Sequence, residues 1–366
     1  MNKSTSIQAL RGLAFLSIFI YHAGLIPSGG SLGVSIFFVL SGFLLMCRSN
    51  EQSMVSSPLR NLKYSCNHIK KLYPLHLVMT VVALPLLFHT WWDHTNAALN
   101  IGARVGVNVL LIQSWFPWES IRYSMNNLSW FLCCMVFLYF MFPMIHNWIV
   151  KIRDVRKKIA LSLGIWALMW ILGYLANYFV GQNGLSPSFC QGLTYNFPIY
   201  RLGDFFIGCI AGSVYKQTDL KLSKKVYTII EAVVLAVSIA FVLINWSGIV
   251  LESLGRRFWE SVPALIPLSI IIVVLFMKCG GGITQFLSKT IFVKLGNISG
   301  EAFLIHELPM TYMAMIIIKL RIGSFGMNIV KAVIGFAITL FAVWIWHKII
   351  RIVDMRKNVQ KKVNWM

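Results

Sequence analysis

The chain has 366 residues, of which 57% are hydrophobic and only 12% are charged. A soluble domain carries about 25% charged residues, so this composition excludes an ordinary water-soluble fold and indicates a protein whose solvent is lipid. The net charge is +21, but the basic residues form short clusters between apolar runs, which is the pattern of cytoplasmic loops rather than of a nucleic-acid-binding surface.

Apolar segments recur from one end of the chain to the other. A membrane-spanning helix needs about 20 mostly apolar residues. We therefore expect an all-α polytopic membrane protein, with one integral domain over residues 1–366 and a short basic cytoplasmic tail at residues 351–366. The expected spans are residues 8–26, 31–47, 73–90, 129–150, 159–181, 199–215, 226–245, 259–278, 295–318 and 327–348.

Residues 101–116 are also apolar, but this segment is short and contains Arg104. If it spanned the membrane, the basic cluster at residues 151–158 would lie outside the cell. Because Lys and Arg favour cytoplasmic loops, we expect the segment to lie in the interface or to re-enter the membrane. This leaves about ten transmembrane helices, with both termini in the cytoplasm.

The first span contains two ionisable residues, Arg11 and His22. Eleven residues of α-helix return a side chain to the same face within roughly 20° and advance it by roughly 16 Å. A charge at the bilayer centre costs at least about 2.5–3.5 kcal/mol, so such residues need a reason. Arg11 could simply reach the cytoplasmic headgroups and His22 could pack in the core. Alternatively, both could belong to a reaction site.

Polar residues also mark the next two segments. Residues 33–43 contain Gly33, Ser35, Ser41 and Gly42, and such small residues allow helices to approach closely. The following loop carries a basic cluster that could bind anionic phosphates, although cytoplasmic topology alone also explains it. The residues of interest in this loop are Arg48, Lys70, Lys71 and Tyr73.

Two later spans contain ionisable residues. Arg201 and Asp204 stand three residues apart and can pair on one helix, while Gly208 and Gly212 favour close helix packing. Residues 299–307 hold three ionisable groups within a single span, which favours a functional role over chance. His306 should lie near the middle of that span, with Ser299 on the same face.

These elements together resemble acyltransferase family 3, the integral-membrane bacterial O-acyltransferases that decorate glycans. Arg11 and His22 match the Arg-x10-His signature of the first helix, and residues 33–45 match a Gly-Val-x-x-Phe-Phe-Val-Leu-Ser-Gly-Phe stretch. The remaining matches follow in family order: Lys70 to Pro74, Leu128 to Pro143 with Ser129 and Trp130, Arg201 to Gly208, and Ser299 to His306. The resemblance covers nearly the whole chain.

The resemblance implies transfer of an acyl group, most often acetyl, from cytoplasmic acyl-CoA to a hydroxyl of a cell-surface or lipid-linked glycan. It further implies a bacterial inner-membrane protein that contacts lipid, with no nucleic-acid partner. Polysaccharide-biosynthesis proteins or further copies of the chain are candidate partners. The seven cysteines fit neither a disulfide framework nor a zinc site, and no metal is expected.

Acyl transfer to a hydroxyl needs a general base and a place for the donor phosphates. The catalytic candidates are His22, Arg11 and His306. His22 is the base, because imidazole titrates near working pH, and Arg11 would anchor the CoA phosphates or orient the donor. His306 would support His22 from behind or lie on the acceptor side. Arg11, Arg48, Lys70, Lys71 and Tyr73 are the candidates for binding acetyl-CoA. The supporting polar residues are Ser35, Ser41, Ser129, Trp130, Arg201, Asp204, Ser299 and Glu301.

Three departures from the family pattern stand out. Many members carry a Glu shortly after the Trp, where this chain has Cys133, Cys134 and Met135. Gly300 replaces the usual Tyr after Ser299, and Lys stands in the basic segment where Arg is common. Lysine keeps the charge of arginine but loses its two-pronged phosphate contact.

Two other classes of function fit parts of the pattern. A proton-coupled transporter of a lipid-linked sugar or organic anion would also need many spans with buried charges, but the halves of the chain show no internal repeat. A structural partner of a polysaccharide synthase would not need His22 and His306 inside the membrane.

Overall fold

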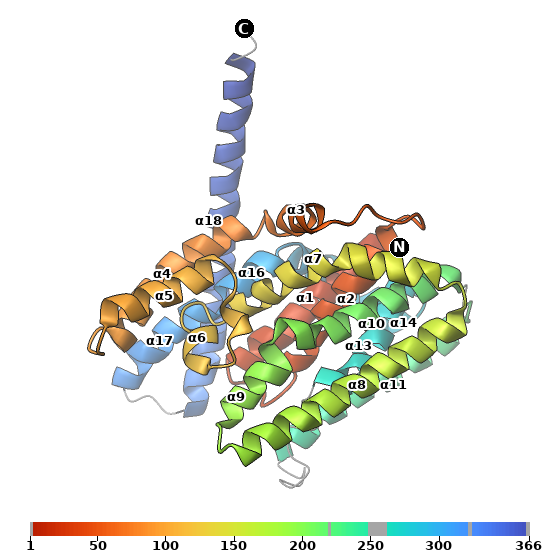
Figure 1. The fold of residues 1–366 in the computed structure, drawn as a ribbon, viewed down its shortest axis with the longest axis horizontal. Coiled ribbons are helices and arrows are strands. Elements are labelled where there is room, and N and C mark those ends of the chain that lie inside the picture. The colour runs from red at the N-terminus through yellow and green to blue at the C-terminus, as the bar shows by residue number, and fades with distance from the viewer. Residues whose placement is uncertain (1–2, 219–220, 248–261, 321–323, 364–366) are drawn as a thin grey trace.

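The computed structural model describes residues 3–218, 221–247, 262–320 and 324–363, which form helices and connecting turns without any β-strand. Figure 1 shows the arrangement. The elements are α1 (Lys3–His22), α2 (Gly30–Arg48), α3 (Pro58–Ile69), α4 (Tyr73–Trp91), α5 (Ala97–Val109), η1 (Gln113–Trp115), α6 (Glu119–Arg122), α7 (Ser129–Lys151), α8 (Val155–Gln182), α9 (Pro187–Gln191), η2 (Gly192–Asn196), α10 (Pro198–Gln217), α11 (Lys224–Ser247), α13 (Val262–Lys278), α14 (Gly282–Leu287), α15 (Thr290–Asn297), α16 (Ser299–Ile305), α17 (Glu307–Leu320) and α18 (Ser324–Val363).

Six of these helices are long and apolar enough to cross a membrane: α2, α4, α7, α8, α11 over residues 224–243 and α18 over residues 328–355. Helix α13 is equally apolar but shorter. Most side chains of α8 and α11 are exposed although apolar, as expected for helices that face lipid. The expected all-α membrane fold is therefore confirmed, and each of the ten expected spans overlaps one or more helices.

Helices α2 and α10 pack together at the centre of the bundle (Figure 1). A Cβ atom on Gly42 would meet the carbonyl oxygen of Phe205 at 2.2 Å, and one on Gly208 would meet that of Val39 at 2.3 Å. Only glycine allows this approach, which is the packing that the small residues of both segments predict. The aromatic rings of Phe38 and Phe205 fill the core beside the crossing and are fully buried.

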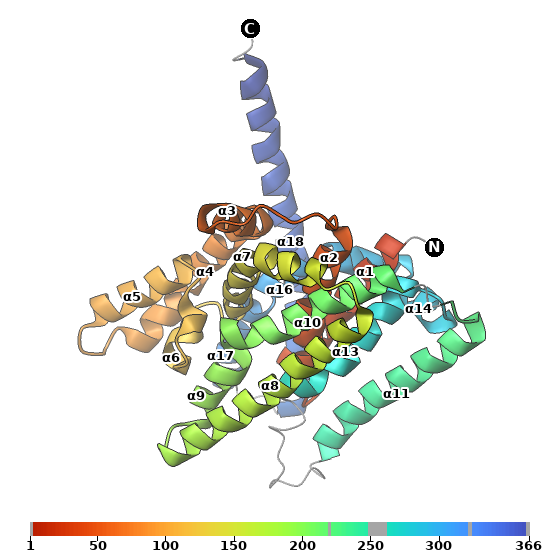
Figure 2. The same cartoon turned by 45° about the vertical axis from the view of Figure 1, so that its right-hand side comes forward.

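Helices α4 and α5 form a hairpin at the edge of the molecule (Figure 2). The 13 residues of α5 cover only about 20 Å, less than the roughly 30 Å of a bilayer core. Helix α5 ends beside the start of α4, because the Tyr73 hydroxyl donates to the carbonyl of Val109 at 3.0 Å and His76 Nε2 lies 2.9 Å from the carbonyl of Asn108. The chain thus turns back along α4, and α5 is too short to cross a bilayer core by itself.

Helix α3 lies across the end of the bundle (Figures 1 and 2). Ser57 caps its first turn by accepting from the Arg60 amide, and Pro58 suits the first helical position. Ser65 fastens it to α7 by donating to the Val136 carbonyl at 2.6 Å, and Tyr64 stacks on Phe142. This contact fixes the basic α3–α4 junction on one face of the molecule.

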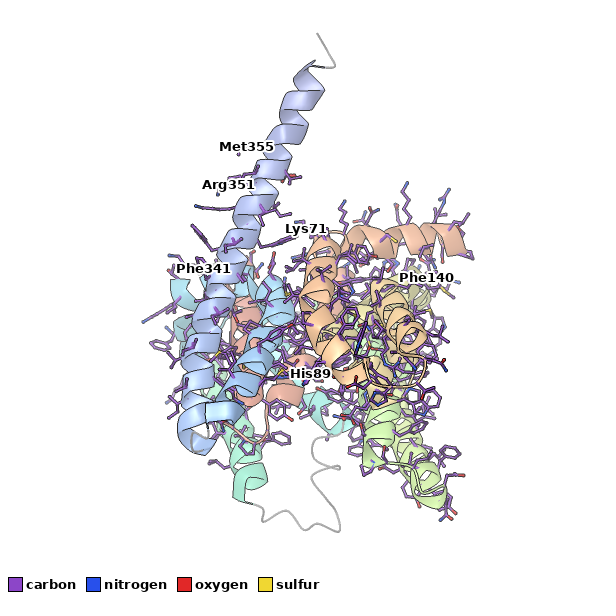
Figure 3. The ribbon with its side chains drawn as sticks, turned by 90° about the vertical axis from the view of Figure 1, so that its left-hand side faces the viewer. Lys71, His89, Phe140, Phe341, Arg351 and Met355 are labelled. Atoms are coloured by element: carbon purple, nitrogen blue, oxygen red, sulfur yellow. The ribbon has the colours of Figure 1, made fainter. Side chains whose placement is uncertain are left out.

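Helix α18 has 40 residues and is about 60 Å long, twice the thickness of a bilayer core. Its last turns project beyond the other helices, and the start of α1 lies on the same side of the bundle (Figure 1). Figure 3 places Arg351 and Met355 on the projecting part, Lys71 at the nearby end of α4, and His89 towards the opposite end of α4. The residues expected as a basic tail therefore continue α18 as helix to Val363.

Candidate active site

The segment expected as the ninth span, residues 295–318, is a broken helix. Helix α16 ends at Ile305, and α17 begins at Glu307, which leaves His306 at the break. Pro309 explains the position, because proline lacks an N–H and its ring clashes with the carbonyl four residues earlier, that of Ile305. Asn126 donates its side-chain amide to the neighbouring carbonyl of Leu304 at 2.8 Å. A break inside a membrane is stable only when such carbonyls are satisfied by the protein.

The imidazole of His306 is held in one orientation. Its Nδ1 lies 3.2 Å from the carbonyl oxygen of Ala302 and 3.0 Å from that of Phe303, and the side chain is fully buried. Carbonyls only accept, so Nδ1 carries the proton and Nε2 presents a lone pair. The rings of Phe15 and Phe19 pack against the imidazole, with centroids 5.5 Å and 5.7 Å away.

His22, the last residue of α1, faces this break. Its Nδ1 lies 3.5 Å from Glu307 Oε1, and its ring stands perpendicular to that of His306 with centroids 5.3 Å apart. Asn127, in the loop before α7, donates to the same Glu307 oxygen at 2.8 Å. Three segments distant in sequence thus bring together His22, Asn127, His306 and Glu307.

The arrangement can remove a proton from a hydroxyl group. A carboxylate beside Nδ1 of an imidazole holds the proton on that nitrogen, so that Nε2 can act as the base. The same carboxylate then stabilises the imidazolium that forms. The side chain of His22 is 23% exposed, whereas His306 is fully enclosed, so His22 is the imidazole that an incoming group can reach.

Arg11 lies on the same face of α1, but the structure does not bring it to His22. Helix α1 is unbroken from Lys3 to His22, so the roughly 16 Å between their Cα atoms expected from the spacing holds. Phe15 and Ile18, both buried, occupy the face between them. Arg11 is partly buried, and the charged or polar groups that act on it most strongly are Tyr139, Glu301 and Arg48.

The basic residues expected to bind the donor lie at the end of the bundle where α1 begins. Arg48, Lys70 and Lys71 are exposed there, and Figure 3 shows Lys71 beside the α3–α4 junction. Tyr73 uses its hydroxyl to hold α5. Glu301 faces His347 of α18 at 3.6 Å. These cations suit the phosphates of a nucleotide-like donor, and they are separated from the His22 site by the length of α1.

The comparisons with known proteins agree with this chemistry. A family model described as an acyltransferase domain, that of acyltransferase family 3, matches residues 4–347. The chain belongs to this acyltransferase family. No solved structure matches it significantly.

Individual members of the family resemble the chain at low identity. The acyltransferase MdmB of Streptomyces mycarofaciens is 25% identical over 329 residues, which cover 84% of this chain and 79% of MdmB. The peptidoglycan O-acetyltransferase OatA of Listeria monocytogenes is 26% identical over 180 residues, 45% of this chain and 28% of OatA. The O-acetyltransferase OatA of Staphylococcus aureus is 22% identical over 240 residues, 62% of this chain and 38% of that protein.

Three serines singled out from the family motifs bond within their own segment or are buried in it. Ser41 donates to the Phe37 carbonyl at 2.6 Å and Ser299 to the Gly296 carbonyl at 2.8 Å, both within their own segments. Ser35 is buried in α2. The hydrogen bonds of Ser41 and Ser299 are therefore local ones.

The Arg201–Asp204 pair forms a second enclosed polar group. The two side chains approach to 3.2 Å and are fully buried, and the guanidinium of Arg201 lies over the ring of Phe38. Trp130 packs against Phe38 and Tyr195 nearby. The pairing expected from the i,i+3 spacing is confirmed, and the pair lies between helices α2 and α10.

Ser129 does connect to the His22 site. Its hydroxyl donates to the carbonyl of Asn126 at 2.7 Å and accepts from Gln113 at 3.0 Å, so it fixes the turn that carries Asn126 and Asn127. The serine of the Ser-Trp block therefore acts on the site through the two asparagines.

Three residues of the site were not assigned a role from the sequence: Asn126, Asn127 and Glu307. Glu307 does stand in the ionisable group of the ninth span, beside His306, but no contact with His22 can be derived from that spacing. A proline three residues after a histidine in an apolar helix is the signal that could have indicated the break. Within the described residues, no group of three or more His, Cys, Asp or Glu side chains could hold a metal ion.

Proposed function

We propose that this protein is a membrane-embedded O-acyltransferase that moves an acyl group, in the first instance acetyl, from cytoplasmic acyl-CoA to a glycan hydroxyl. The observation that carries the proposal is the contact of His22 with Glu307, in a chain that belongs to an acyltransferase family. A scaffold has no need for such a pair; a proton-coupled carrier could use one, so it is the acyltransferase family that favours the transferase.

Proton transfer takes place at the His22 end of α1, and the donor phosphates bind near its other end. Acyl-CoA supplies an acyl carbon activated as a thioester, whose carbon–sulfur bond breaks as the new carbon–oxygen bond forms. His22 Nε2 takes the proton of the acceptor hydroxyl and then returns it to the departing sulfur, while Glu307 keeps Nδ1 protonated. Arg11, Arg48, Lys70 and Lys71 hold the phosphates at the other end of the helix.

The acceptor class rests on the relatives. OatA of Listeria monocytogenes is named for O-acetylation of peptidoglycan, a glycan, although its match covers only 28% of that protein. A glycan or a lipid-linked saccharide presents hydroxyl groups at the membrane surface, where the partly exposed His22 can meet them. With such an acceptor, the protein would act together with polysaccharide-biosynthesis proteins.

The proposed orientation has ten spans, both termini in the cytoplasm and the bacterial inner membrane as its location. The exposed cations of the α3–α4 junction and the projecting end of α18 lie on one side of the bundle, which supports assigning that side to the cytoplasm (Figure 3). His22 then lies towards the outer leaflet, and Arg11 between His22 and the cytoplasm.

Cysteine labelling tests this orientation. A cysteine replacing Lys157, an exposed residue near the start of α8, should be protected from membrane-impermeant thiol reagents added outside the cell. A cysteine replacing Trp118, which is 53% exposed just before α6, should react. Both measurements use a background without the native cysteines. Labelling at position 157 from outside would reverse the sidedness or make residues 101–116 a true span.

Arg11→Lys tests the donor site. The planar guanidinium can grip a phosphate with two hydrogen bonds, whereas lysine offers a mobile point charge. Loss of one charge-assisted contact costs roughly 1.5–3 kcal/mol, so we expect use of acyl-CoA to fall by at least about tenfold with normal expression. The measurement is transfer rate against acyl-CoA concentration in nanodiscs, with Arg351→Lys on the projecting part of α18 as the matched control. Superimposable curves for wild type and Arg11→Lys would return Arg11 to the role of an interfacial anchor.

A further inference from the structure

Three buried polar atoms of the candidate site have no hydrogen-bond partner in the protein. They are Nε2 of His306, Oε2 of Glu307 and Oδ1 of Asn127. Their side chains gather around His22, whose Nδ1 lies 3.5 Å from Glu307 Oε1 and whose ring centroid lies 5.3 Å from that of His306, while Asn127 donates to the same Glu307 oxygen. These unsatisfied atoms therefore form one cluster, and His22 lies at its edge.

All three atoms are hydrogen-bond acceptors. The two carbonyls beside His306 Nδ1 require the proton on that nitrogen, which leaves Nε2 with a lone pair. The amide nitrogen of Asn127 must be the atom that faces the Glu307 carboxylate, which leaves its oxygen free. A carboxylate oxygen only accepts. The cluster thus calls for a ligand that brings O–H or N–H groups.

Leaving a buried acceptor unpaired is destabilising, so a cluster of three needs a ligand that satisfies it. The Arg201–Asp204 pair also has unsatisfied atoms, but there a donor and an acceptor face each other within a closed core. The cluster at His306 differs in two ways. It contains acceptors alone, and it adjoins an imidazole that is 23% exposed. A ligand that reaches His22 lies next to these acceptors, and an anion would be repelled from them.

We propose that the cluster is an acceptor subsite that binds two neighbouring hydroxyl groups of an uncharged sugar ring. The reacting hydroxyl donates to His22 Nε2, and the adjacent hydroxyl donates to the free acceptors of His306 and Glu307. The two imidazole rings lie side by side, with centroids 5.3 Å apart, so the hydroxyls that they accept from belong to neighbouring positions of one ligand. This inference rests on the proposed function and adds a selection rule to it: the second hydroxyl is required, and a charged group in its place is rejected.

The test uses acetyl-CoA with the methyl glycosides of glucose, galactose and mannose, and then the single-deoxy and uronate analogues of the best acceptor. Removing the neighbouring hydroxyl should lower kcat/KM by at least about tenfold, because it leaves the buried acceptors unpaired. The uronate should be poorer than the parent sugar. A deoxy analogue that reacts as well as its parent, or a preferred uronate, overturns the proposal.

A variant of His306 tests whether this residue binds the hydroxyl next to the reacting one. His306→Phe keeps the ring volume but removes the acceptor nitrogen, so the ratio of parent to deoxy kcat/KM should fall to about one, whatever the loss in absolute rate. His94→Phe, at an exposed residue of the α4–α5 turn, should keep the wild-type ratio. An unchanged ratio in a folded His306→Phe protein removes His306 from the subsite.

Equilibrium binding separates this proposal from the proposed function. Wild-type protein in nanodiscs is titrated with the same glycosides in the absence of acetyl-CoA. Weaker binding of the deoxy analogue supports the subsite even if no acyl transfer is found. The absence of transfer would contradict only the transferase mechanism. Equal binding of parent and deoxy analogue, or no binding of any glycoside, overturns the subsite.

Discussion

His22→Ala is expected to lower acyl transfer by the purified protein by at least about 100-fold, because a positioned general base contributes roughly 10²–10⁴ to rate. The side chain stands at the end of α1 and its neighbours lie on other segments, so its removal leaves the helix contacts of α1 with α2 and α15 in place. The protein should still insert and purify as the wild type does. The measurement is the initial rate of acetyl transfer from acetyl-CoA in nanodiscs, with protein amount and thermal unfolding compared in parallel.

His89→Ala provides the matched control. His89 is exposed near the far end of α4 and takes no part in the site, so its loss should leave the rate within a factor of two or so (Figure 3). This pair of variants also tests the rival functions. A transporter or a scaffold would consume no acetyl-CoA in either protein. Normal turnover in His22→Ala would remove His22 from the mechanism, even if the wild type proves to be an acyltransferase.

The helices follow from the apolar runs of the sequence. Runs of about 20 apolar residues have few other solutions in lipid, where every backbone group must be bonded within the segment. The glycines of α2 and α10 also predicted that these helices pack closely, since a residue without a side chain lets two membrane helices approach each other. The expectation that residues 101–116 do not span rests on charge, because a crossing there would misplace the cations that follow.

Which residues meet at the site could not be predicted from the sequence. Arg11 and His22 could be placed on one face from helix periodicity, but nothing local says which other segment meets that face. Asn126 and Asn127 lie in a loop whose composition resembles any polar turn, and their contacts with Leu304 and Glu307 join residues about 180 positions apart. Long-range pairing of this kind leaves no periodic trace in the chain.

The break at His306 was not predicted, because the apolar run around it suggested one continuous span and hid the effect of a proline. Residues 295–318 are apolar enough to be expected as one continuous span, although Pro309 cannot continue a helix without freeing a carbonyl. The structure divides the segment into α15, α16 and α17, and the break presents His306 and Glu307 to α1. The missing carboxylate after Trp130, where Cys133 and Cys134 are buried, is therefore no obstacle, since Glu307 supplies a carboxylate from another segment.

Glu307→Gln is expected to lower acyl transfer by about 10²–10³-fold while leaving the fold intact. Glutamine has the same shape as glutamate, and its amide oxygen can still accept from Asn127 and from His22 Nδ1. What it lacks is the negative charge that stabilises the imidazolium once His22 has taken the proton. In a site from which water is largely excluded, that charge is worth far more than at a surface. Glu51→Gln, in the exposed loop after α2, is the matched control and should retain the wild-type rate.

The double variant His22→Ala/Glu307→Gln distinguishes a working pair from two independent structural contacts. If Glu307 acts only through His22, removing its charge matters only while the imidazole is present, so the double variant should be no slower than His22→Ala alone. If Glu307 instead serves the helix break or binds the acceptor, the two losses should multiply; a role in the break should also lower the thermal stability of Glu307→Gln. Rates and unfolding temperatures for the four proteins, measured in one nanodisc preparation, separate the two cases. A wild-type rate in Glu307→Gln would show that Glu307 does not assist His22 in the reaction.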